Sequence, residues 1–309
     1  MQTILILGGA GFIGAALVKR FLDGEDRRVL VLEPEGADIS RLEPFSGRIS
    51  LVRAALDEGA LIADVLDCNH VDVVIHLVST MIPGSGLEHF QRETASVVNP
   101  SAGLFRLCAQ RGVRLVYFSS GGTVYGNGCG TPHREDDALR PVSYYGLSKS
   151  LVEEMIRFEQ RRSGLDYLIV RPSNAYGPGQ KPGRKQGLIA VAAGKAMKGE
   201  PLQIWGDGSA VRDYIFVDDL ADAVYRLVLK GVSCETVNIG SGKGHTVNEV
   251  LDILRRLMGR ELKAEYTERR GVDVDSIVLD CSRLRSYIDF RPTSLEDGIK
   301  KFTDSIGKI

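Results

Sequence analysis

The first fourteen residues constrain what this chain folds into more than any other stretch. Apolar residues 3–7 lead directly into the run Gly8-Gly9-Ala10-Gly11-Phe12-Ile13-Gly14, and apolar residues then recur at helical spacing over 17–22. A continuous apolar run is typical of a strand that is covered on both faces. The sequence therefore predicts a buried strand, a glycine turn and a helix, which is an arrangement that binds dinucleotides.

The glycines of this turn have separate expected tasks. Gly8 permits the tight turn, Gly11 lets the backbone approach a pyrophosphate, and Gly14 lets the helix pack closely on the sheet. The helix that begins near Phe12 and Ile13 offers unpaired N–H groups and partial positive charge to the phosphates. We therefore expect these five residues to bind a dinucleotide cofactor.

Strand and helix patterns alternate along the first half of the chain. Such alternation predicts an α/β fold with a doubly wound parallel sheet, the Rossmann arrangement. The expected strands are 29–32, 49–52, 71–77, 113–119 and 165–171, and the expected helices include 58–66, 88–111 and a segment that contains 145–158.

Length and composition limit the remaining possibilities. At 309 residues the chain approaches the size at which one domain divides into two. We expect a cofactor-binding domain over 1–172, to which 211–245 return, and a smaller α/β substrate domain over 173–210 and 246–309.

The net charge of −1 gives no reason to expect nucleic acid or an anionic membrane as a partner. We expect a cytoplasmic protein, because the five cysteines are scattered and the sequence shows no basic leader and no apolar run of membrane-spanning length. We expect no metal site.

An acidic residue follows the second expected strand. Glu33 stands about twenty residues after the glycine turn, where a carboxylate accepts hydrogen bonds from the adenosine ribose and repels a 2′-phosphate. NAD is therefore favoured over NADP. The alternative is a solvated acid at the end of a strand.

The chemical centre is expected at Tyr145 and Lys149. Their spacing of four residues places both side chains on one face of a helix. A phenol has an ordinary pKa of about 10, and a nearby ammonium favours the phenolate. We therefore expect Lys149 to bring the pKa of Tyr145 towards neutrality, so that the phenol acts as a general base, and also to hold the cofactor ribose.

With these motifs in place, the chain resembles the extended branch of the short-chain dehydrogenase/reductase superfamily, and within it the nucleotide-sugar epimerase group. The Gly-x-x-Gly-x-x-Gly turn, Tyr-x-x-x-Lys and the segment Arg171-Pro172-Ser173-Asn174-Ala175-Tyr176-Gly177-Pro178-Gly179 carry the resemblance. It implies further cofactor contacts at Leu56, Leu77, Val78, Ser79, Ser119 and Pro172. It also implies nucleotide-sugar contacts at Thr123, Asn174, Trp205, Arg212, Arg270 and Asp273.

The resemblance leaves the third catalytic group open. In the family a serine or threonine completes a triad with the tyrosine and lysine, and this chain has Gly121 at that position. If the strand stays extended, Ser120 points to the other side, whereas Thr123 is able to turn its hydroxyl inward. We expect Thr123 to take the role, with an ordered water as the other possibility.

The same segment separates the reactions of the family. Related dehydratases carry an acidic Asp-Glu pair where Gly122 and Thr123 stand, because water elimination needs an additional acid and base. The expected function is NAD-dependent epimerisation of a UDP-hexose or UDP-N-acetylhexosamine at C4 through a 4-keto intermediate. Ile277, in place of a bulkier tyrosine, favours room for a 2-acetamido group. The alternatives are a sugar-nucleotide reductase or dehydrogenase with net cofactor turnover, and a catalytically weak NAD-binding regulatory protein.

The resemblance also implies a homodimer. Family members commonly pair two long helices from each subunit into a four-helix bundle. The matching segments here are residues 88–111 and 143–162.

Overall fold

The computed structural model describes residues 1–127, 132–183, 186–268 and 274–307. The chain divides into two compact units. The first comprises Met1–Ser120, Ser143–Arg171 and Ala221–Val237, and the second comprises Gly121–Val142, Pro172–Leu220 and Asn238–Ile309. This division differs from the expected domains in three places. The second unit takes up Gly121–Val142, the return to the first unit begins only at Ala221, and that return ends at Val237.

The first unit is built on a seven-stranded sheet in the order β10-β6-β5-β4-β1-β2-β3. Neighbouring strands with a described register run parallel, and the order reverses between β1 and β4, so the doubly wound Rossmann fold is confirmed. The strands are β1 (Gln2–Leu7), β2 (Arg27–Glu33), β3 (Ile49–Arg53), β4 (Val73–His76), β5 (Arg114–Phe118), β6 (Tyr167–Pro172) and β10 (Glu235–Ile239).

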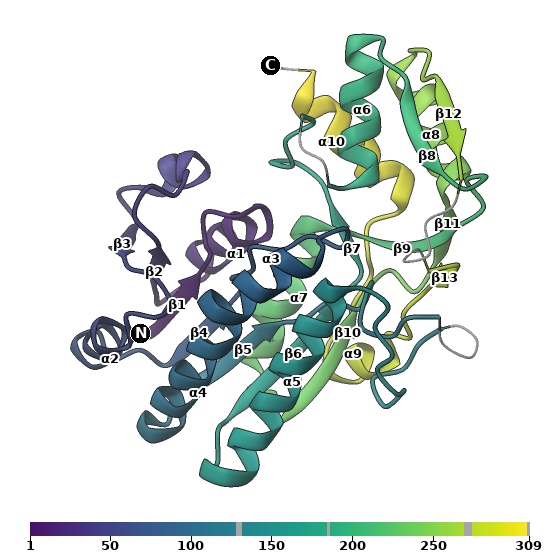
Figure 1. The fold of residues 1–309 in the computed structure, drawn as a ribbon. Coiled ribbons are helices and arrows are strands. Elements are labelled where there is room, and N and C mark those ends of the chain that lie inside the picture. Colours follow the sequence, from purple (N-terminus) through teal and green to yellow (C-terminus); the bar gives the residue numbers. More distant parts are fainter. Residues whose placement is uncertain (128–131, 184–185, 269–273, 308–309) are drawn as a thin grey trace. The chain divides into compact units, whose positions relative to one another are not determined.

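Helices cover both faces of this sheet. On one face α2 (Gly59–Cys68), α4 (Asn99–Arg111) and α5 (Tyr144–Ser163) pack on the sheet, and α4 lies beside α5 (Figure 1). On the other face the Phe21 ring of α1 (Phe12–Leu22) meets the Tyr225 ring of α7 (Val217–Leu229) edge to face. A short 3-10 helix, η1 (Ser40–Phe45), connects β2 to β3.

The expected long helix over 88–111 is present as three consecutive parts. These are α3 (Leu87–Glu93), a π-helical segment η2 (Thr94–Val98) and α4. Pro100, at the start of α4, has no N–H to donate within the helix, and such a gap favours a wider turn just before it. Asn99, the first residue of α4, is exposed at this junction.

The second unit has its own core, formed by helices on a set of short strands. The helices are α6 (Leu188–Lys198), α8 (Val247–Met258), α9 (Ser282–Tyr287) and α10 (Leu295–Ile306). The strands are β7 (Asn174–Tyr176), β8 (Leu202–Trp205), β9 (Val211–Phe216), β11 (Gly244–Thr246), β12 (Ala264–Thr267) and β13 (Ser276–Ile277). Thr246 and Glu249 form a capping box at the start of α8, and Ser294 caps α10.

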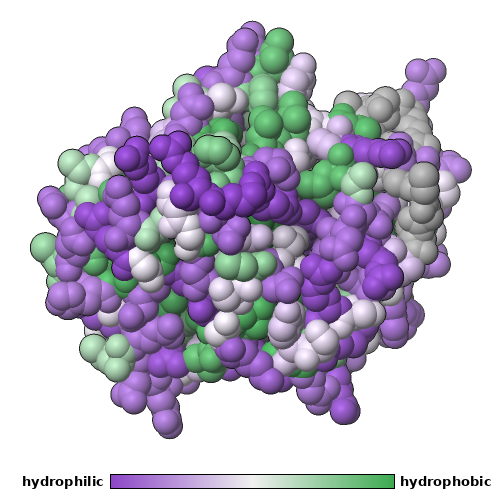
Figure 2. Space-filling model, turned by 90° about the horizontal axis from the view of Figure 1, so that it is seen from below, coloured by the Kyte–Doolittle hydropathy of each residue, from purple (hydrophilic) through white to green (hydrophobic). Residues whose placement is uncertain are grey.

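The surface agrees with the ordinary composition of the chain. Hydrophilic residues cover most of the face in Figure 2, and hydrophobic residues gather there in smaller areas. None of the described helices has both the length and the apolar character needed to cross a membrane. The four cysteines that the structure describes are free thiols.

Candidate active site

The glycine turn has the geometry that its sequence predicts. Gly8 has a φ of +83°, and its carbonyl accepts a hydrogen bond from the Gly11 N–H at 3.2 Å. A Cβ atom on Gly14 would lie 2.2 Å from the Gly8 carbonyl oxygen and 2.7 Å from the Gly9 Cα. Glycine is therefore needed at position 8 for the backbone conformation and at position 14 for the close approach of α1 to the turn.

The N-terminus of α1 fits the pyrophosphate of a dinucleotide. Gly11 is the N-cap, it provides no side-chain hydrogen bond, and the first turn carries no acidic residue. Gly11 is exposed, while Phe12 and Ile13 are half-buried. The first turn of α1 therefore contributes no carboxylate of its own that would compete with a phosphate for its N–H groups and for the partial positive charge of the helix.

Glu33 links the end of β2 to the glycine turn. Its side chain is buried, and Oε1 accepts a hydrogen bond from the Ala10 N–H at 2.6 Å. Burial raises the pKa of Glu33, while the Ala10 hydrogen bond and the charge of Arg53 lower it. The Glu33 carboxyl thus lies beside the glycine turn. This is the place that it must occupy if it binds the adenosine ribose.

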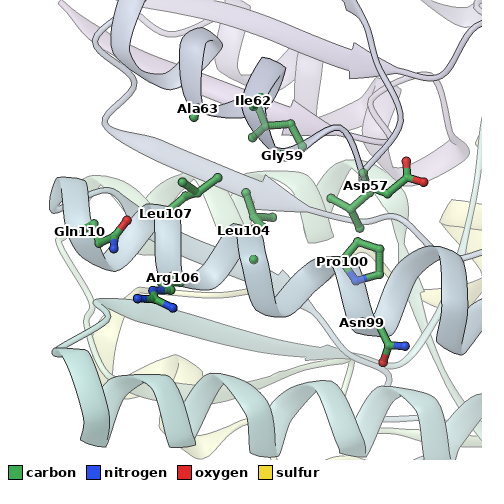
Figure 3. A pocket seen from close by; sticks show the side chains of 13 residues that line it. Asp57, Gly59, Ile62, Ala63, Asn99, Pro100, Leu104, Arg106, Leu107 and Gln110 are labelled. Carbon is green, nitrogen blue, oxygen red and sulfur yellow. The ribbon is translucent and has the colours of Figure 1, made fainter.

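A groove of about 580 Å³ lies between α2 and α4, next to the end of β3 (Figure 3). Leu56, a predicted cofactor contact, forms part of its lining. Ile62 of α2 and Leu104 and Leu107 of α4 give it an apolar wall (Figure 3). The exposed Asn99 side chain also lines this groove (Figure 3).

The segment after β4 is held by two buried polar side chains. His76 accepts a hydrogen bond from the Val78 N–H at Nδ1, and its Nε2 lies 3.0 Å from the Ser101 hydroxyl. Burial, together with the charge of Lys149, lowers the pKa of His76 to about 3, so the ring is neutral. Glu93 of α3 accepts hydrogen bonds from the Ser79 hydroxyl at 2.7 Å and from Thr80.

Tyr145 and Lys149 share one face of α5. The Lys149 ammonium lies 5.6 Å from the Tyr145 ring centroid and donates a hydrogen bond to the Phe118 carbonyl oxygen at 3.1 Å. Burial lowers the pKa of Lys149 to about 8, against the opposing charges of Glu93 and Glu153. Lysine therefore loses its proton much more readily here than in water.

The pKa of Tyr145 differs from our expectation. Burial and the charge of Glu93 together raise it to about 12, against a hydrogen bond with the Ser120 hydroxyl that lowers it. The prediction that Lys149 alone brings this phenol towards neutrality was wrong for the protein without ligands, because the cost of burying a phenolate outweighs the attraction of an ammonium that is directed at the Phe118 carbonyl.

The hydroxyl beside Tyr145 comes from Ser120. We expected Ser120 to point away, but β5 ends at Phe118, and beyond that residue the strand alternation no longer decides the direction of a side chain. The Thr123 hydroxyl is buried and has no hydrogen-bond partner among the described residues. Gly121, at the family position of the hydroxyl, donates its N–H to the Pro172 carbonyl oxygen at 2.9 Å.

A buried ion pair lies one helical turn beyond Lys149. Glu153 accepts hydrogen bonds from Arg171 Nε at 2.9 Å, from Arg171 Nη2 at 2.6 Å and from Arg157 Nη2 at 2.8 Å. Ser119 donates its hydroxyl to the same carboxylate. Burial would raise the pKa of Glu153, but Arg171, Ser119 and Arg157 lower it below the ordinary value. Ser119, expected as a cofactor contact, therefore uses its hydroxyl to join β5 to α5.

The expected substrate residues that are described belong to the second unit. Asn174 begins β7, and Trp205 ends β8 with 42% of its surface exposed. Arg212 of β9 donates to the carbonyl oxygens of Val274 at 2.7 Å and Asp275. Arg270 and Asp273 lie outside the described residues.

Sequence reasoning missed three groups that act on Tyr145 or Lys149. Ser120 was assigned the wrong direction, while Glu93 and Glu153 were not singled out at all. Glu153 had a usable signal, since it continues the four-residue spacing of Tyr145 and Lys149. Nothing in the local sequence distinguishes Glu93 from a solvated acid at the end of a helix.

Fold and site together define a dinucleotide-dependent enzyme with a Tyr-x-x-x-Lys centre. Residues 4–240 match the NAD dependent epimerase/dehydratase family, and the chain belongs to that family. NAD is therefore its cofactor.

Named relatives span the whole chain. It is 31% identical over 300 residues to a putative UDP-glucose 4-epimerase of Methanocaldococcus jannaschii, with 96% of each chain covered. It is 30% identical to a dTDP-4-dehydro-6-deoxyglucose reductase of Escherichia coli, which covers 98% of this chain and 97% of the relative. The structure of UDP-glucose 4-epimerase from Thermotoga maritima with UDP-glucose superposes with a TM-score of 0.91 at 28% identity, with 99% of each chain covered. The chain is thus an NAD-dependent sugar-nucleotide enzyme.

Proposed function

We propose that this protein is an NAD-dependent 4-epimerase of a UDP-hexose or UDP-N-acetylhexosamine. The observation that carries the proposal is the cluster of Tyr145, Lys149 and Ser120 in the same unit as the glycine turn. The likeness to UDP-glucose 4-epimerases over nearly the full length of the chain supports it.

Bound NAD supplies a hydride acceptor for C4 of the sugar. Tyr145 takes the proton of the C4 hydroxyl, and the Ser120 hydroxyl stabilises the phenolate by hydrogen bonding. Lys149, as an ammonium, favours the same phenolate and holds the cofactor ribose. After the 4-keto sugar has turned, Tyr145 would return the proton to the C4 oxygen of the epimer.

The substrate is held through its nucleotide diphosphate in this account. Arg212 and Arg270 bind the diphosphate, since guanidinium groups match phosphate oxygens in a bidentate manner. Asn174 supports the diphosphate, Trp205 packs beside the uracil and Asp273 binds the ribose. Ile277, in place of a larger tyrosine, leaves space for a 2-acetamido group.

A reductase is the second candidate function. It is supported by the identity of 30% to the Escherichia coli reductase, which is about as high as the 31% identity to the putative epimerase of Methanocaldococcus jannaschii. A reductase consumes one equivalent of reduced cofactor per product, whereas an epimerase regenerates its cofactor within each turnover. The contact between Ser120 and Tyr145 argues against a catalytically weak NAD-binding protein, because it supplies the hydroxyl that Gly121 lacks.

The test is incubation of the purified protein with UDP-glucose, UDP-N-acetylglucosamine and their uronic acids, read by NMR. The proposal predicts the C4 epimer of one of them without added cofactor, and no product with Tyr145→Phe. Stoichiometric consumption of reduced cofactor would instead establish the reductase. Full activity of the phenylalanine variant would exclude Tyr145 as the base.

We also propose that the protein forms a homodimer through α4 and α5. Tyr144, Leu151 and Phe158 are spaced seven residues apart along α5, so they lie on one face, and each is more than a third exposed. A second copy of the same helices would cover this stripe. The free thiols are consistent with a reducing compartment such as the cytoplasm.

A further inference from the structure

Glu93 is a buried acid that the proposed chemistry does not use. It is the last residue of α3 and only 2% of its surface is exposed. Its Oε1 accepts from the Ser79 hydroxyl at 2.7 Å, and its Oε2 accepts from the Thr80 N–H at 2.7 Å and the Thr80 hydroxyl at 2.6 Å. The helix packs against α5, where the Phe90 ring stacks on Tyr144 with centroids 5.3 Å apart. This brings Glu93 to the end of α5 that carries Tyr145 and Lys149.

Two buried carboxylates act on Lys149, and they differ in how they are neutralised. Glu153 binds Arg171 and Arg157, so two positive charges offset its negative charge. Within the described part of the chain, Glu93 accepts hydrogen bonds only from neutral donors, the Ser79 hydroxyl and the N–H and hydroxyl of Thr80. The charge of Glu93 is therefore the less compensated of the two and acts on the ammonium more fully.

The other groups around Lys149 supply no negative charge. Its ammonium lies 5.2 Å from the Tyr117 ring centroid and 3.1 Å from the Phe118 carbonyl oxygen, both on β5. His76 on β4 is neutral, and Tyr145 on its own helix keeps its proton, because burial raises the pKa of that phenol to about 12. Among the described residues, Glu93 and Glu153 are thus the carboxylates that oppose the burial of Lys149.

We propose that Glu93 is a positioning residue that supplies a buried counter-charge to the Lys149 ammonium while it holds the Ser79-Thr80 segment in place. This inference rests on the proposed function only for its effect on turnover. Burial lowers the pKa of Lys149 to about 8, and Glu93 raises it. Without this charge, Lys149 loses its proton within the neutral range and no longer favours the Tyr145 phenolate.

The test is the titration of Lys149 in the full-length protein, followed by NMR of its ¹³Cε resonance and assigned with Lys149→Arg. We expect Lys149 to titrate near pH 8 in the wild type. In Glu93→Gln the midpoint should fall by about one to two pH units, the size expected for removing one charge at about 6–12 Å in an effective dielectric of about 20. Glu93→Asp keeps the charge and should titrate close to the wild type. The control Glu88→Gln removes an exposed acid from the same helix and should change nothing.

Turnover gives an independent readout of the same charge. If the protein epimerises a sugar nucleotide, the alkaline limb of its pH profile should move down with the NMR midpoint in Glu93→Gln. A shifted Lys149 titration without epimerase activity would overturn the proposed function and leave this inference standing. Epimerase activity together with an unchanged Lys149 titration in Glu93→Gln would overturn this inference and leave the proposed function standing.

A second neutral variant guards against misfolding. Glu93→Met has a side chain of similar length and should lower the Lys149 midpoint as glutamine does. If both neutral variants fail to fold while Glu93→Asp folds, Glu93 is a structural acid and the proposal is overturned.

Discussion

Replacing Glu153 with glutamine removes one partner of an ion pair that is fully buried. The Glu153 side chain has no exposed surface, and Arg171 has 1%. Glutamine keeps one acceptor oxygen but directs an amide N–H₂ at the guanidinium, so a buried positive charge loses its counter-charge. Breaking a buried pair in this way costs about 3–5 kcal/mol.

The size of this loss fixes the expected shift in melting temperature. Unfolding entropy is about 2.1 cal/mol/K per residue, or about 0.65 kcal/mol/K for 309 residues, so Glu153→Gln should lower Tm by about 5–8 °C. The matched control is Glu154→Gln. Glu154 is the next residue on α5, its side chain is 65% exposed, and it pairs with the same Arg157. An exposed pair contributes about 0–1 kcal/mol, so the control should shift Tm by about 1 °C or less.

Calorimetry over a range of pH gives a second check. The folded-state pKa of Glu153 is lower than its ordinary value of 4.5. Its contribution to the free energy of unfolding is therefore fully present above pH 4.5 and is lost as the pH falls through the lowered pKa. Wild type and Glu153→Gln should therefore converge in Tm as the solution becomes acidic. Equal Tm values for the Glu153 and Glu154 variants at pH 7 would refute the reasoning, as would a difference that grows in acid.

Three further predictions concern the site and the assembly. Ser120→Ala should lower kcat by about 10²- to 10³-fold, as the loss of a preorganised donor does, while Thr123→Val should cost less; the opposite order would return the catalytic role to Thr123. Gly14→Ala should weaken NAD binding about tenfold or more in calorimetry, because its Cβ would meet the Gly8 carbonyl oxygen at 2.2 Å, whereas Gly103→Ala, which meets nothing within 4 Å, should not. Light scattering should find a dimer that Leu151→Glu with Phe158→Glu turns into a monomer, with Met197→Glu, another exposed apolar residue, as the control.

The parts of the fold that follow from local pattern were predictable. Residues 3–7 are covered on both faces of the sheet, and a continuous apolar run records that environment directly. Gly8 and Gly14 are fixed by backbone conformation and close packing, which leave few alternatives to glycine. The capping box at Thr246 depends on two side chains three residues apart, so it too is visible in the sequence.

The remaining features depend on contacts between distant segments. Ser120 lies beyond the end of β5, so strand alternation gave the wrong direction for its hydroxyl. The small strands of the second unit, some of only two or three residues, are too short to show a period. The pKa of Tyr145 is governed by burial and by Glu93, which is 52 residues away in the chain. No local spacing reports such an interaction.

The central claim is that C4 is oxidised and reduced within one active site with Tyr145 as the base. The most direct measurement uses the UDP-sugar substrate labelled with deuterium at C4, in ordinary water and without added cofactor. The account predicts that the deuterium remains at C4 of the epimer and that Tyr145→Phe forms almost none of this product. Exchange of the label with solvent, or an epimer formed at the wild-type rate by the phenylalanine variant, would contradict it.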